Sequence, residues 1–279
     1  MANGGLPSPG AGAEKSDPLS VSLKERDKDI LGMVRRALEE DRVMLAFQPV
    51  VQARKQDRPA FYEGLIRILD GSGRIIPAGE FIGAVETDEI GRMIDCAALK
   101  HGLDALSQEP TLRLSINMSA RSIGYQKWNR ILNRRLRHDP TLGERLILEI
   151  TERSAIVMPE LVKTFMTDLQ EQGVSFALDD FGSGYTSFTY LRDFYFDILK
   201  IDGQFMRGIH ANPDNQVLVR AIISLANHFD MLTVAEFIET EQDARMVADF
   251  GIDCLQGYFF GKPTVKPFWM NDDRQKQIG

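Results

Sequence analysis

Cysteine, histidine and long apolar runs are scarce in this sequence, and each scarcity excludes a class of protein. The chain of 279 residues has two cysteines, Cys96 and Cys254, far apart, which excludes a disulfide framework and indicates a reducing compartment, the cytoplasm. Its four histidines form no closely spaced pair, so a metal site would use oxygen ligands, favouring Mg²⁺ or Mn²⁺ over Zn²⁺. No apolar stretch approaches the ~20 residues that span a bilayer, so no membrane partner is expected.

Positive charge is in deficit as well. The chain has 33 lysine and arginine residues against 40 aspartate and glutamate residues, which gives a net charge of −7. This balance argues against a DNA or RNA duplex as the partner, and an anionic ligand would need local compensation. The densest basic run lies on a predicted helix and consists of Arg130, Arg134, Arg135 and Arg137. It is interpreted as a solvated helix face, with a binding patch as the alternative.

Four segments can be distinguished along the chain. Residues 1–18 are rich in glycine, proline and alanine and lack the charged-then-apolar order of a signal peptide, so we expect a disordered tail. An apolar stripe in residues 19–41 predicts an N-terminal helix. The rest of the chain predicts one large domain over residues 42–265 and a C-terminal tail over residues 266–279.

The large domain alternates strands and helices after an opening pair of strands. Residues 42–51 and 60–69 predict strands, and the eight residues between them, QARKQDRP, are too few for a crossover helix, so this pair should be antiparallel. Further strands, with helical segments between them, are expected at 111–119, 145–151, 174–180, 196–202, 231–237 and 252–257. Such units imply a parallel sheet, open or closed, and eight strands favour closure. We predict an α/β fold, a (β/α)₈ TIM-like barrel with an antiparallel first strand.

Ionisable and amide side chains follow consecutive strands of this barrel, at the ends where barrel enzymes carry their chemistry. Any single one is better explained as a helix cap or loop residue, because Asp and Asn are common in turns. A run over five consecutive strand ends is harder to explain in that way. The residues are Asn117, Glu149, Glu152, Asp179, Asp180, Lys200, Asp202, Glu236, Glu239 and Gln256.

Carboxylates gathered on one rim repel each other unless cations lie among them. Those expected to converge are Glu63, Glu149, Asp179, Asp180 and Glu236. With the amide oxygen of Asn117 they would form a hard-oxygen site suited to Mg²⁺ or Mn²⁺. Two adjacent aspartates can hold two ions ~3.5–4 Å apart, which activates water for attack on phosphorus. Lys200 can hold or deprotonate that water, and Arg67, on the same strand face as Glu63 and Leu65, offers a forked donor for a phosphate.

Eight short motifs occur in order along the domain. They are FQPVV, EGLIR, SINMSA, LEITE, DDFGSGYTSF, LKID, AEFIET and QGYFFGKP. Through these motifs, residues 40–263 resemble the EAL-domain phosphodiesterases, which hydrolyse cyclic di-GMP. The resemblance implies a (β/α)₈ barrel with an antiparallel first strand, a homodimer, and a phosphodiester hydrolase that opens cyclic di-GMP to linear pGpG with two Mg²⁺ or Mn²⁺ ions.

The resemblance also implies roles for individual residues. The first metal ion would be held by Glu63, Asn117, Glu149 and Asp179, and the second by Asp179, Asp180 and Glu236. Lys200 would contact the attacking water as a candidate base, and Glu152 would hold the loop after Asp180. Lys200, Glu152 and Glu236 are the predicted catalytic residues. Gln48, Leu65 and Arg67 match positions that contact the substrate in the family. Asp202, Glu239 and Gln256 match polar positions that line the same pocket.

The main departures from the family's pattern are at two positions. Gly64 stands where the signature has an alanine, and Phe237 stands beside Glu236 where a glycine is usual. No cyclase motif is found, so the chain is expected to be a stand-alone domain or a fragment of a longer protein. Two other functions stay open: a catalytically silent receptor for cyclic di-GMP that signals through protein contacts, and a metal-dependent barrel enzyme for another substrate. Retention of every ligand position and of Lys200 favours the phosphodiesterase.

Overall fold

The strands of the computed structural model close into a barrel. Residues 18–184 and 188–270 are described, so the predicted tails lie outside the described residues except for Pro18 and residues 266–270. Strands β1 (Val43–Gln52) and β2 (Lys55–Leu69) pair antiparallel. Parallel strands then continue from β2 through β4 (Leu114–Asn117), β5 (Leu146–Thr151), β6 (Ser175–Phe181), β7 (Ile198–Ile201), β8 (Leu232–Ala235) and β9 (Cys254–Gln256). Strand β9 pairs antiparallel with β1 and closes the ring, which confirms the predicted barrel and its antiparallel first strand.

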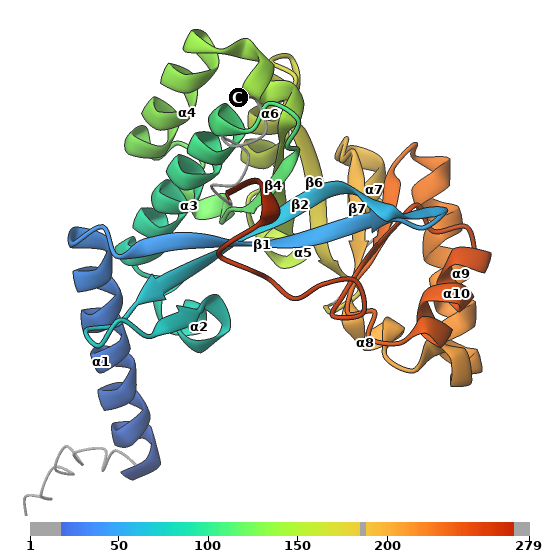
Figure 1. Ribbon diagram of the computed structural model, residues 1–279, viewed down its shortest axis with the longest axis horizontal. Coiled ribbons are helices and arrows are strands. Elements are labelled where there is room, and N and C mark those ends of the chain that lie inside the picture. Colours follow the sequence, from blue (N-terminus) through green and yellow to red (C-terminus); the bar gives the residue numbers. More distant parts are fainter. Residues whose placement is uncertain (1–17, 185–187, 271–279) are drawn as a thin grey trace, which may run out of the picture.

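Helices surround this barrel (Figure 1). They are α1 (Pro18–Glu39), α2 (Ile82–Val85), α3 (Glu89–Gln108), α4 (Gln126–His138), α5 (Glu152–Val157), α6 (Pro159–Gln170), α7 (Phe188–Asp193), α8 (Gly203–Met206), α9 (Pro213–His228) and α10 (Glu241–Asp249). Side chains cap several of them; Asp88 accepts a hydrogen bond from the Ile90 N–H at the start of α3, and Thr240 accepts one from the Asp243 N–H at the start of α10. None of the described helices is both long and apolar enough to cross a membrane.

Among the strands and α-helices of the described residues, three short elements have no counterpart in the sequence prediction. Strand β3 (Ile75–Pro77) pairs antiparallel with β2, and the helices α5 and α8 each begin directly after a barrel strand or one residue later. Elements of one or two turns, or of three strand residues, are too short to show a hydrophobic period. The first helical segment after β3 is divided, with a 3₁₀ turn at Ala78–Glu80 before α2.

A ring of apolar side chains fills the inside of the barrel. Its members are buried together and come from seven strands: Val50, Phe61, Ile147, Ala177, Ile198, Val234 and Cys254. On the parallel strands, the residue two positions later faces the same side and is polar, as Glu63 is after Phe61. On β1, which runs the other way, the polar residue comes two positions earlier, at Gln48. The antiparallel first strand therefore contributes its polar side chain to the same end of the barrel as the others.

The hairpin of β1 and β2 has no crossover helix of its own, and the C-terminal segment covers part of its outer face. Thr264 forms a β-bridge with Phe47. The Trp269 ring packs edge-on against Phe47 and Tyr62, with centroid distances of 5.3 and 4.6 Å. Part of the segment predicted as a tail, over residues 266–270, is thus packed on the barrel.

We expect Gly257→Ala to destabilise the barrel strongly. A Cβ atom at this position, directly after β9, would lie 2.0 Å from the carbonyl oxygen of Ile238 and 2.3 Å from its nitrogen. The same nitrogen donates to the carbonyl of Gln256, so the backbone is not free to move away. The free energy of unfolding should fall by about 2 kcal/mol or more, measured by chemical denaturation. Gly83→Ala in α2, where a Cβ meets nothing within 4 Å, is the control and should not destabilise; equal midpoints for Gly257→Ala and the wild type would contradict the clash.

Candidate active site

A buried lysine lies at the centre of the carboxyl end of the barrel. Lys200, on β7, is only 1% exposed. Its Nζ lies 2.7 Å from Glu149 Oε2, 2.9 Å from Glu236 Oε1, 3.0 Å from Asp179 Oδ1 and 3.6 Å from Glu63 Oε2. These partners come from β5, β6 and β2 and from the residue directly after β8. The structure therefore brings together the residues that the sequence placed at separate strand ends.

Amide side chains surround Glu63 on its other sides. Asn117 Nδ2 donates to Glu63 Oε1 at 2.8 Å, and Gln256 Nε2 donates to Glu63 Oε2 at 2.5 Å. Gln48 lies next to Gln256, with 3.4 Å between Gln48 Oε1 and Gln256 Nε2, and donates from its own Nε2 to the Gly261 carbonyl. The orientation of Glu63 is thus fixed by donors from β4 and β9.

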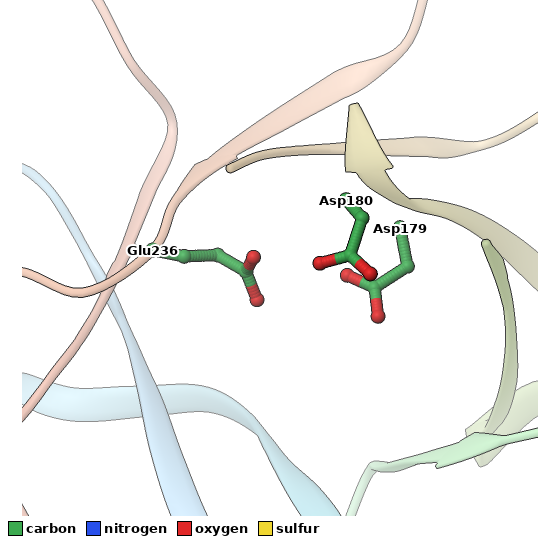
Figure 2. A group of neighbouring side chains, drawn as sticks. All are labelled: Asp179, Asp180 and Glu236. Carbon is green, nitrogen blue, oxygen red and sulfur yellow. The ribbon is translucent and has the colours of Figure 1, made fainter. Parts of the chain in front are cut away.

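Asp179 and Asp180 both turn toward the site although they are adjacent in a strand (Figure 2). Simple alternation would send Asp180 to the outer face. Its backbone adopts φ +56°, in the left-handed region, and the pairing of β6 with β7 shifts register between Leu178 and Phe181. Aspartate tolerates this conformation better than most residues. The bulge therefore brings the two carboxylates together, and Gly182, with φ +92°, continues the turn.

The loop after Asp180 is anchored to the start of α5. Glu152 is buried, and its Oε2 accepts a hydrogen bond from the Gly182 N–H at 3.1 Å. Gln204 Nε2 donates to the Gly182 carbonyl from the other side, at 2.8 Å. The position of Asp180 therefore depends on contacts from both α5 and α8.

The cluster opens into a cavity of about 540 Å³. Predicted residues that line it are Gln48, Glu63, Leu65, Arg67, Asp179, Asp180, Lys200, Glu236, Glu239 and Gln256. Asn117 and Glu149 lie beneath this surface, bonded to Glu63 and Lys200. Asp202 is not among the lining residues: its Oδ1 accepts from the Gln204 N–H at 2.7 Å and caps α8. A cap is the simpler interpretation that the sequence allows for any aspartate after a strand.

Several lining residues were not singled out as site residues from the sequence. They are Pro77, Ala78, Gly79, Arg207, Phe237, Gly257, Tyr258 and Pro263. The first three belong to β3 and the turn after it, which carried no periodic signal. Arg207 is the residue directly after α8. The sequence indicated it only as a basic residue shortly after a barrel strand.

The electrostatics of the cluster follow from burial and crowding. Burial and the neighbouring Glu63 charge raise the pKa of Glu149 to about 8. Burial likewise raises the pKa of Glu236 well above its usual value. Burial opposes the charge of Lys200, but the four carboxylates outweigh it and raise the pKa of this ammonium. Lys200 is therefore a charged donor in this arrangement.

The donor set fits a divalent cation of the hard class. Carboxylate oxygens of Asp179, Asp180 and Glu236 all lie within 4.8 Å of one another (Figure 2). Glu149 Oε1 is buried and has no hydrogen-bond partner among the described residues. An unpaired buried carboxylate oxygen is costly, and a bound cation would satisfy it. All candidate ligand atoms are oxygens, as Mg²⁺ and Mn²⁺ prefer.

The loop after Asn117 is held by a buried aspartate on α3. Asp95 Oδ2 accepts hydrogen bonds from the Ser122 hydroxyl at 2.5 Å and from the Ser119 N–H at 3.1 Å. Burial raises the pKa of Asp95 to about 6, against hydrogen bonds that lower it. A carboxyl group at the base of the site thus titrates above its ordinary range.

A closed α/β barrel with carboxylates around a lysine, at the carboxyl ends of its strands, defines the class: a barrel protein with an acidic cluster whose oxygen atoms could hold divalent cations. The family model described as "EAL domain" matches residues 32–263, most of the chain. The chain belongs to the EAL domain family.

Two curated relatives are about a third identical to the chain over the aligned residues. The cyclic di-GMP phosphodiesterase PdeF of Escherichia coli K12 is 32% identical over 251 residues, covering 88% of this chain and 33% of the relative. The signaling protein YkoW of Bacillus subtilis 168 is 32% identical, covering 88% of this chain and 31% of the relative. The solved complex of the PaMucR phosphodiesterase with c-di-GMP has a TM-score of 0.72 at 27% identity, covering 85% of this chain and 97% of that one. The chain spans about a third of the length of these two curated relatives.

We expect Lys200→Met to destabilise the protein in the absence of divalent cations. Removal of the ammonium leaves buried carboxylates unpaired, which should lower the free energy of unfolding by roughly 3–5 kcal/mol at neutral pH. The loss should shrink at acidic pH, where the carboxylates that are still charged at neutral pH take up protons. Denaturation in EDTA measures both effects. Lys163→Met, which removes a partly exposed ion pair with Glu160, is the control and should change stability by less than ~1 kcal/mol; equal stability of Lys200→Met and the wild type would exclude the central role of the ammonium.

Asp95 should make stability depend on pH in a defined window. Because its pKa of about 6 in the folded state exceeds the ordinary value of 3.8, the folded state binds the proton more tightly. The stabilisation of the folded state by the proton on Asp95 is complete below about pH 4 and is lost as the pH rises to about 6. The difference in stability between Asp95→Asn and the wild type should therefore change by roughly 3 kcal/mol across this window. Asp57→Asn, at an exposed position, should show no such change; a flat difference for Asp95→Asn would disprove the assignment.

Proposed function

We propose that this domain hydrolyses cyclic di-GMP to linear pGpG with two bound Mg²⁺ or Mn²⁺ ions. The observation that carries the proposal is the convergence of Glu63, Glu149, Asp179 and Glu236 on Lys200 at the floor of a cavity. Its volume, about 540 Å³, is in the range of small-molecule sites. PdeF and PaMucR, which are both named phosphodiesterases, support the reaction class.

The ligand roles follow from the two sides of the cluster. Glu63, Asn117, Glu149 and Asp179 would hold one ion, and Asp179, Asp180 and Glu236 the other. When bound, the ions supply a water of lowered pKa and neutralise charge at phosphorus. Lys200 contacts the attacking water and orients it. Glu152 acts at a distance, because it holds the Gly182 loop that sets the position of Asp180.

The upper walls of the cavity bind the substrate. Arg67 offers a planar fork of donors to a phosphate, which a lysine would not. Gln48, Leu65, Glu239 and Gln256 line the same cavity and contact the nucleotide. Asp202 supports the site through the cap of α8. A homodimer and a cytoplasmic location belong to the same proposal, as family expectations.

One observation favours a second function, a catalytically silent receptor for cyclic di-GMP. Phe237 directly follows the candidate ligand Glu236 and has φ +53°, a conformation that favours glycine. A bulky residue there changes the backbone that carries a ligand. Binding without hydrolysis would then be the activity of the cavity.

Incubation of the purified protein with cyclic di-GMP and Mn²⁺ should yield pGpG, detected by chromatography. Glu63→Ala should abolish turnover, because it removes a candidate ligand that Asn117 and Gln256 orient. Glu160→Ala, an exposed carboxylate on α6, is the matched control and should retain full activity. Tight binding by the wild type without product would support the receptor. The absence of both binding and product would exclude both functions.

A further inference from the structure

Phe237 is placed where neither the backbone nor the core explains an aromatic residue. Its φ of +53° lies in the left-handed region, which is unfavourable for bulky side chains. Its side chain is not in the core, because the residue is 45% exposed. Phe237 also lines the cavity, next to Glu236 in the chain. A strained backbone beside a site is an observation from which function can be inferred.

The ring of Phe237 is held from one side by α8 and the residue after it. A Cβ atom on Gly203 would lie 2.3 Å from Cδ2 of the ring, so the glycine makes room for it. The Arg207 guanidinium lies over the ring, 4.6 Å from the centroid. Gly203 begins α8 and Arg207 is the residue directly after it, so both contacts come from one short segment. This segment therefore holds the ring in place.

Phe237 is nearly half exposed and lines the cavity. Within the part of the chain that the structure describes, Phe237 and Arg207 line the cavity together with Lys200 and the carboxylates. An aromatic ring that is held in place at a cavity wall, beside a guanidinium, can stack on a flat partner. Nucleobases bind aromatic side chains by stacking, and purines offer the larger face.

We propose that Phe237, fixed by Arg207 and Gly203, is the stacking platform for one purine base of the bound cyclic dinucleotide. This inference rests on the proposed function and adds a specificity determinant to it. Glu236 and Phe237 are consecutive, so the base on the ring and the phosphodiester at the carboxylates lie within the span of one nucleotide. The unusual backbone of residue 237 directs the ring to this place. Phe237 is then a substrate-binding residue that acts whether or not turnover follows.

The test compares variants that separate the ring from the backbone. Phe237→Leu removes the ring and keeps a side chain in the left-handed conformation, whereas Phe237→Gly removes the ring and relieves the backbone. Phe237→Tyr keeps an aromatic face. Tyr195→Leu, an exposed aromatic at the amino end of β7, is the control.

Binding of cyclic di-GMP is measured by calorimetry in Ca²⁺, and KM and kcat are measured in Mn²⁺ if product forms. We expect Phe237→Leu and Phe237→Gly to weaken binding about tenfold or more and to raise KM rather than lower kcat. The affinity of Phe237→Tyr should stay within about twofold of the wild type. The preference for cyclic di-GMP over its uracil analogue should shrink in the two variants without a ring. Tyr195→Leu should match the wild type.

The outcomes separate this inference from the proposed function. Wild-type affinity in Phe237→Leu and Phe237→Gly overturns the platform and leaves the phosphodiesterase or receptor intact. Equal losses for cyclic di-GMP and its uracil analogue also overturn it, because they indicate a structural defect. Absence of binding and turnover in the wild type overturns the proposed function itself.

Discussion

The ammonium group of Lys200 is the interaction on which the site depends. Four carboxylates from different strands approach it within 3.6 Å in the interior of the protein. Buried charges of one sign do not assemble without a partner, because desolvation and repulsion oppose it. The lysine on β7 stands between the strands that carry Asp179 and Glu236, so the barrel supplies the compensating charge from its own wall. The free protein can therefore keep its acidic groups together before any ligand arrives.

Much of this arrangement could be predicted from the sequence because barrel strands obey a period of two. Apolar residues such as Phe61 and Ala177 face inward, and the polar residue two positions later reaches the rim. The segment QARKQDRP is too short for a crossover helix; the strands extend into it and leave a turn of Ala53 and Arg54, which reverses the first strand and accounts for the position of Gln48. Local rules of pairing and alternation were sufficient for these features.

Other features depend on tertiary contacts that no local rule contains. Alternation sends Asp180 outward, and its true position requires a bulge and a left-handed backbone. An aspartate after a strand can be a ligand or a cap, and only the position of α8 makes Asp202 a cap. The contact of Arg207 with Phe237 joins elements that are 30 positions apart. Such residues meet because the packed barrel places them together.

The pairing of the first strand with the last has a consequence for the order of folding. Val50 pairs with Gln256, and Gln256 in turn donates to Glu63, so partners more than 190 positions apart complete both the ring and the ligand cluster. Contacts of such long range form slowly, since a large loop must close first. During synthesis, a chain that lacks the QGYFFGKP segment would hold most of its acidic residues without a closed wall. The closed wall and the complete acidic cluster are then formed only when β9 has left the ribosome.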